Sequence, residues 1–120
     1  MGTLSKSQIL SATDLPIEAV EVPEWGGTVH VRTLSSYERD QFEAATVKVR
    51  GRKTEPNLAN LRARLACLVI CDEKGKPLFD VTEDARMLGD KSSKALDRVL
   101  AVARRLNGMD DEAVEEAAKN

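Results

Sequence analysis

The chain has 120 residues and a formal net charge of −2, with 42% apolar and 32% charged residues, which is ordinary for a single globular domain. Aromatic residues make up only 3%, so the core must be aliphatic and a stacking platform for nucleic-acid bases is disfavoured. The longest apolar run, residues 65–71, is far too short for a membrane span, and the N-terminus lacks the apolar stretch of a signal peptide. We therefore expect an intracellular protein.

Residues 1–17 are predicted to be a mostly irregular, flexible N-terminal segment. Their apolar residues Ile9, Leu10, Leu15 and Ile17 follow no clean period, and Pro16 interrupts them. A single globular domain is expected over residues 18–109.

A β-hairpin is predicted over residues 19–33, where apolar and polar residues alternate on both sides of Gly26-Gly27. A two-residue loop at these glycines pairs Val22 with Val31 on the core face and Glu21 with Arg32 as a cross-strand ion pair. Because Pro23 cannot donate a backbone hydrogen bond, its strand should be an edge strand.

A helix over about residues 36–50 follows, because Ser35-x-x-Glu38 matches the capping box. Its core-facing stripe would be Phe42, Ala45 and Val49, and Gly51 would end it. Residues 51–56 are then expected to be a polar loop.

Three more helices are predicted, over about residues 57–71, 82–88 and 92–106. Asn57 is the expected N-cap of the first, whose leucines at positions 58, 61, 65 and 68 form the central core stripe, and Thr82 is the expected cap of the second. Between them, residues 72–75 should form a turn, and Leu78 and Phe79 should close one end of the core. The fold class is therefore α+β, mainly α-helical, with an N-terminal β-hairpin packed on a bundle of about four to five helices.

Residues 110–120 are predicted to form an acidic C-terminal helix with a thin apolar face. Such a helix needs to dock on its own core or on a partner.

Charge is unevenly distributed along the chain. A basic run contains Lys48, Arg50, Arg52, Lys53, Arg62 and Arg64, with Glu55 as the one acid between them. This run could be a solvated face, bind an acidic protein, or form a phosphate-binding patch. The acidic residues 110–120 carry the opposite charge to this basic run, so head-to-tail self-association between copies of the chain is a specific hypothesis. The candidate partner-binding residues are Trp25, Arg50, Arg52, Lys53, Asp111, Glu112, Glu115 and Glu116, and the alternative for Trp25 is a side chain folded back over the hairpin.

Catalytic, cofactor and metal sites are not predicted. His30 is the only histidine, and Cys67 and Cys71 lack the second ligand pair of a structural zinc site, so we interpret them as buried small side chains. The residues thus indicate a small interaction protein. The alternatives are a small helical nucleic-acid-binding regulator that uses residues 48–64 and an enzyme that uses one of the two cysteines.

The order of these motifs resembles the tail assembly chaperones of long-tailed bacteriophages or prophages. The resemblance rests on the hairpin and capped helix (residues 20–43), the helix and turn at 62–79, and the last helix at 88–109. It covers about residues 9–119.

The resemblance implies a non-enzymatic protein of the host cytoplasm that is absent from the mature virion. It would bind the tape measure protein and keep it soluble while the tail tube protein polymerises, and it would self-associate as a homo-oligomer. Family members commonly also exist as a longer, frameshifted form, and the residues Ala118-Lys119-Asn120 are compatible with codons on which a ribosome could slip.

Overall fold

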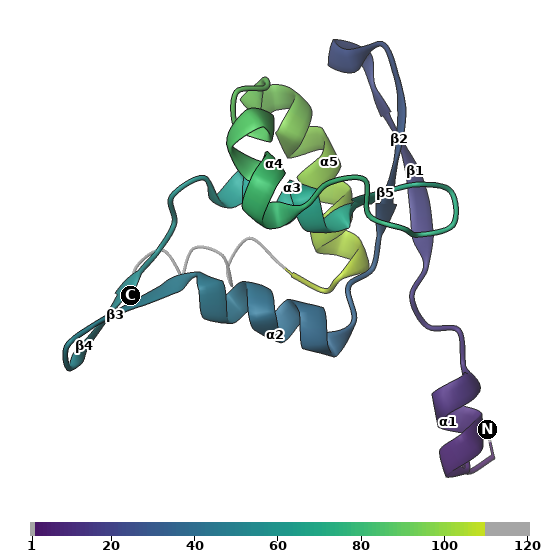
Figure 1. Ribbon diagram of the computed structural model, residues 1–120. Helices are drawn as coiled ribbons and strands as arrows, with labels where there is room; N and C mark the ends of the chain where they lie inside the picture. Colours follow the sequence, from purple (N-terminus) through teal and green to yellow (C-terminus); the bar gives the residue numbers. More distant parts are fainter. Residues whose placement is uncertain (1, 110–120) are drawn as a thin grey trace.

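The computed structural model of the chain describes residues 2–109 and shows a small sheet packed against helices, with one helix and one hairpin projecting from this body (Figure 1). The helices are α1 (Lys6–Ser11), α2 (Ser36–Ala45), α3 (Leu61–Val69), α4 (Val81–Leu88) and α5 (Ser93–Leu106), and the strands are β1 (Ile17–Val22), β2 (Gly27–Arg32), β3 (Val47–Arg50), β4 (Lys53–Pro56) and β5 (Ile70–Cys71). The predicted α+β class with an N-terminal hairpin packed on helices is confirmed.

The N-terminal hairpin exists, but its predicted register is wrong. Pro23–Trp25 form one turn of 3-10 helix closed by Gly26 at φ +70°, because proline favours the first position of such a turn. The strands therefore pair Val22 with Gly27, four residues away from the expected Val31. The predicted Glu21–Arg32 ion pair is also wrong, since Glu21 lies opposite Thr28.

The faces of the hairpin are nevertheless as predicted. A shift by an even number of residues leaves each side chain on the same face of the sheet, and Val22 and Val31 are both fully buried. The strand order β1-β2-β5 makes β1 an edge strand, which confirms that expectation, although Pro23 itself lies in the turn. Helix α5 packs on β1 and β2, and Arg98 reaches Glu24 at 2.9 Å.

Two predicted helices are shorter than expected because their ends are strands. Helix α2 ends at Ala45, and residues 47–56 form the antiparallel β3–β4 hairpin where a continued helix and then a loop were expected. Val47 and Val49 alternate with charged residues, which is a period-two pattern. Likewise α3 ends at Val69, and Ile70–Cys71 continue as β5 along β2.

The starts of α3 and α4 also differ from the prediction. Helix α3 begins at Leu61, with Asn60 rather than Asn57 at the N-cap, and Asn60 has a positive φ of 55°. Its side-chain Nδ2 donates to the carbonyl of Ala85 at 2.8 Å and thereby joins α3 to α4. Helix α4 is capped by Asp80, whose carboxylate accepts from the amides of Thr82 and Glu83.

Helix α5 agrees with the prediction over residues 92–106, and its apolar face (Leu96, Val99, Leu100 and Ala103) is buried. The turn at 72–75 is also confirmed, with Asp72 accepting from two backbone amides. Leu78 and Phe79 were both expected to close one end of the core. Phe79 does pack against the core, whereas Leu78 is 57% exposed.

The N-terminal segment contains a helix where irregular structure was expected. Ser5 and Gln8 form a capping box at the start of α1, and all residues of this helix are exposed. Within residues 2–109, no helix is both long and apolar enough to span a membrane.

Candidate functional site

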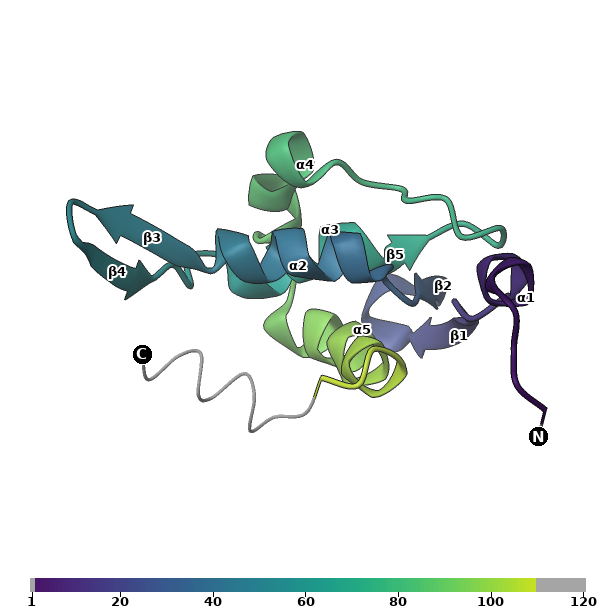
Figure 2. The ribbon, with the colours of Figure 1, turned by 90° about the horizontal axis from the view of Figure 1, so that it is seen from below.

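Residues 36–57, which comprise α2 and the β3–β4 ribbon (residues 47–56), form an arm that is exposed along much of its length. Figure 2 shows the ribbon extending α2 away from the sheet and the other helices. None of the ten residues of α2, all of which the structure describes, is buried. The arm is therefore available for contact with another molecule.

The ribbon carries the basic residues that were predicted from the sequence to bind a partner. Gly51, at φ +61°, and Arg52 form its turn, and Arg50 lies directly opposite Lys53 in the register. Arg52 and Lys53 are both exposed, so their positive charge is accessible to an acidic partner.

The base of the ribbon is held by Arg64. Its guanidinium donates to the carbonyls of Ala45 at 3.0 Å, Asn57 at 2.6 Å and Ala59 at 3.0 Å. The backbone amide of Asn57 also donates to Thr46 at 2.6 Å. Because an isolated two-stranded ribbon is marginal in water, these bonds fix where the arm leaves the body.

The other end of the arm is anchored by Arg32 and Glu38. Arg32 donates both Nη atoms to the carboxylate of Glu38, at 3.0 and 2.7 Å, and its Nε to the carbonyl of Leu68 at 2.7 Å. The hydrogen bond from Arg32 lowers the pKa of Glu38 to about 2, against the opposing effect of burial. Arg39 adds a bond to the carbonyl of Asn107, at the C-terminus of α5.

The basic run does not form one continuous surface. Arg62 pairs with Asp97 at 2.9 Å on the surface, and Arg64 is engaged at the arm base. Residues 47–50 and 53–56 of this run form strands instead of the predicted helix end and loop, and α3 begins only at Leu61.

Trp25 lies far from the ribbon. It occupies the turn of the β1–β2 hairpin, at the opposite end of the molecule in Figure 1. Its side chain is half-buried and packs against the core, as the alternative interpretation expected. The structure thus does not bring Trp25 together with Arg52 and Lys53.

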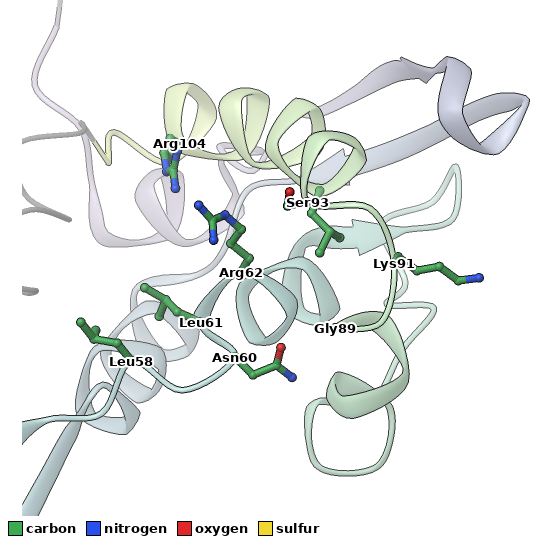
Figure 3. Close-up of a pocket in the computed structure, with 9 residues that line it drawn as sticks. Leu58, Asn60, Leu61, Arg62, Gly89, Lys91, Ser93 and Arg104 are labelled. Carbon is green, nitrogen blue, oxygen red and sulfur yellow. The ribbon is translucent and has the colours of Figure 1, made fainter.

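Two hollows flank the arm and α5, and neither was predicted from the sequence. An apolar hollow of about 220 Å³ lies beside α2 and is lined by Phe42, Ala45, Leu68 and Val81, with Glu38, Gln41 and Arg64 at its polar parts. A basic groove of about 380 Å³ is lined by Leu58, Asn60, Leu61, Arg62, Gly89, Lys91, Ser93, Leu96 and Arg104 (Figure 3). Phe42, Leu58 and Leu61 had been assigned to the core, and the sequence gives no signal that they line hollows.

The cysteines have the environment of core residues. Both are buried and free. Burial raises the pKa of Cys67 to about 11, helped by Asp84 and Asp80, and burial also raises the pKa of Cys71. The reactive thiolate is therefore scarce at neutral pH. Among residues 2–109, no group of three or more His, Cys, Asp or Glu side chains could hold a metal ion.

The acidic half of the predicted interface lies outside the described residues. Asp111, Glu112, Glu115 and Glu116 all follow Met109, the last residue that the structure describes. Their pairing with the ribbon stays a prediction.

Comparison with known families identifies the family of this chain. A family model described as phage tail assembly chaperone matches residues 11–120, which is most of the chain. Neither the curated proteins nor the solved structures give a significant match.

Proposed function

The chain belongs to the phage tail assembly chaperone family, and on that premise we propose that it binds the tape measure protein of its phage and keeps it soluble while the tail tube protein polymerises around it. Because it belongs to this family, the chain is a non-enzymatic chaperone that binds tail components. The proposed step takes place in the cytoplasm of the bacterial host, and the chaperone is absent from the mature virion.

The observation that carries the proposal is the arm with its apolar hollow. A long, largely helical tape measure protein exposes apolar stripes before the tube covers it, and such stripes need a partner surface. The hollow beside α2 offers Phe42, Leu68 and Val81 without a covering element among the described residues. An amphipathic helix placed along α2 would bury its apolar face there, as in other helix-in-groove complexes.

Co-expression with the tape measure protein tests this proposal. The wild-type chain should keep the tape measure protein soluble and co-elute with it through size exclusion. Ala45→Glu places a charge in the apolar hollow without removing a core side chain and should abolish co-elution. The matched control is Ala44→Glu, on the same helix but outside the hollow, and it should behave as wild type. A tape measure protein that stays insoluble with both the wild-type chain and any frameshifted longer form would contradict the proposed function.

We also propose head-to-tail association between copies. The basic ribbon tip, with Arg50, Arg52 and Lys53, would meet the acidic residues Asp111, Glu112, Glu115 and Glu116 of the next copy, and the longer form would join the same assembly. Arg52→Glu with Lys53→Glu should then reduce the mass measured in solution, and an unchanged mass would contradict this interface. Trp25, at the other end of the molecule, is a further candidate contact for the client.

A nucleic-acid-binding regulator is the second candidate function, because a projecting two-stranded ribbon with basic residues has a shape that can contact phosphates. The net charge of −2 for the whole chain disfavours it. A strongly salt-dependent shift of duplex DNA that Arg52→Glu with Lys53→Glu removes would favour this function over the chaperone.

A further inference from the structure

We propose that the acidic C-terminal segment, residues 110–120, docks into the basic groove of its own chain and covers it. This inference does not depend on the proposed function, because it concerns two parts of one chain. Its basis is the chemistry of the groove, the direction in which α5 ends, and the length and charge of the segment.

The groove combines an apolar floor with basic side chains. Leu58, Leu61 and Leu96 form the floor, while Arg62, Lys91 and Arg104 supply positive charge, and none of the lining residues that the structure describes is acidic. Figure 3 shows Arg62 on α3 reaching toward Arg104 on α5, with Lys91 at the opposite end of the groove. Arg62 also pairs with Asp97 at 2.9 Å on the surface, and this exposed pair could be exchanged for one with the segment at little cost, since exposed ion pairs contribute little to stability.

Helix α5 ends in a turn that reverses the chain beside this groove. Gly108 has φ +65°, the amide of Met109 donates to the carbonyl of Arg104 at 2.8 Å, and the amide of Gly108 donates to Arg105 at 3.4 Å. These bonds form a Schellman motif, which ends a helix and turns the backbone. Met109 is buried and fixes the exit point. The chain therefore leaves the described structure next to Arg104, which lines the groove.

The segment matches the groove in length and in charge. The groove follows α5 from Arg104 back to Ser93, and the eleven steps between these two residues span about 16 Å of helix. The eleven residues of the segment would span the same length as a helix. Asp110, Asp111, Glu112, Glu115 and Glu116 outweigh its single lysine, and Ala113, Val114, Ala117 and Ala118 recur on one helical face that could meet the leucine floor.

This docking would compete with association between copies. An acidic segment held in its own groove cannot at the same time bind the ribbon of a second copy. The groove would then limit self-association, and a variant that empties the groove should associate more readily wherever the head-to-tail contact exists.

Paramagnetic broadening in the full-length chain tests the docking. A nitroxide reagent should react selectively with the thiol introduced by Asn120→Cys, because Cys67 and Cys71 are buried. The label should broaden the amide signals of Lys91 and Ser93 in the same chain. Arg62→Glu with Lys91→Glu should restore these signals, and both positions are exposed, so the fold is retained and can be checked on the core amides.

Two controls separate the docking from its rivals. Arg52→Glu with Lys53→Glu makes the same charge change on the ribbon and should leave the broadening in place. A mixture of spin-labelled chain with isotope-labelled chain lacking the nitroxide should show no broadening of the amides of Lys91 and Ser93. Absence of broadening in the labelled chain, its persistence in the groove variant, or its appearance only in the mixture would each overturn the proposal. None of these results depends on the tape measure protein, so they are distinguishable from a failure of the proposed function.

Discussion

At the scale of single residues, Arg32 does most to set the position of the arm. Its side chain is 11% exposed and joins β2, on which it lies, to the carboxylate of Glu38 in α2 and to the last turn of α3. The bidentate geometry uses the planar fork of the guanidinium, which a lysine could not reproduce. The capping box of Ser35 and Glu38 was predicted from the sequence, but Arg32 was expected to pair with Glu21.

The Arg32–Glu38 pair predicts a specific dependence of stability on pH. The folded pKa of Glu38 is about 2, below its usual value of 4.5, so its contribution to stability is full above about pH 5 and is lost as the pH falls from 4.5 toward 2. Because the carboxylate is partly exposed, we expect a loss of about 1 to 2 kcal/mol in the free energy of unfolding.

Denaturant titrations of wild type and Glu38→Gln between pH 2 and 7 would measure this loss. Glu38→Gln should be destabilised by about 1 to 3 kcal/mol at pH 7, since it leaves the charge of Arg32 unpaired. It should also lack this component of the pH dependence. The control Glu43→Gln removes the exposed pair with Arg39 and should change stability by less than about 0.5 kcal/mol. Parallel pH curves for wild type and Glu38→Gln would contradict the assignment.

At the scale of elements, the β3–β4 ribbon is an isolated structure held at its base. Its ladder connects only four residue pairs, from Val47 with Pro56 to Arg50 with Lys53. A two-stranded ribbon is marginal by itself, so the bonds that Arg64 and Asn57 make at its base stabilise it.

Replacing Arg64 should loosen the ribbon without unfolding the core. Arg64→Lys keeps the charge but cannot reach the carbonyls of Ala45, Asn57 and Ala59 together. We expect a local loss of about 1 to 2 kcal/mol and, in hydrogen exchange, amides of residues 47–56 that exchange on the order of tenfold faster. Amides of α5 should be unchanged. Arg62→Lys, at an exposed position on the same helix, is the control, and equal effects of the two substitutions would refute this role for Arg64.

At the scale of the whole molecule, the core is a single cluster contributed by the sheet, α3, α4 and α5. Its most buried side chains include Val22, Val31, Ile70 and Leu100, together with both cysteines. The arm and the Trp25 turn lie outside this cluster at opposite ends (Figure 1). Substitutions at the two ends should therefore act independently of each other.

The position of the cysteines makes thiol labelling a measure of global stability. Cys67 is 0% exposed and Cys71 is 1% exposed, so a thiol reagent at pH 7 should label both only when the chain unfolds. The labelling rate should rise with denaturant in parallel with the fraction unfolded. The Asn120→Cys variant should add one rapidly labelled thiol. Rapid labelling of two thiols in the folded wild type would contradict the burial of these cysteines.

The sequence by itself determined the features that depend on local chemistry. The capping box at Ser35, the apolar face of α5, the turn at Asp72 and the valines on the inner face of the hairpin all follow from hydrogen-bonding groups or periodicity within a few residues. The family resemblance was also available from the order of these motifs, and the family match confirms it.

Only the tertiary structure decided the elements whose local signals were ambiguous. Residues 47–50 and 70–71 continue helical patterns in the sequence but form strands, because β5 gains its hydrogen bonds from the distant β2 and the ribbon gains its base from Arg64. The hairpin register depended on how Pro23–Trp25 fill the turn. The hollow beside α2 and the basic groove depend on residues from three or four separate elements and loops, so no local window of sequence could reveal them.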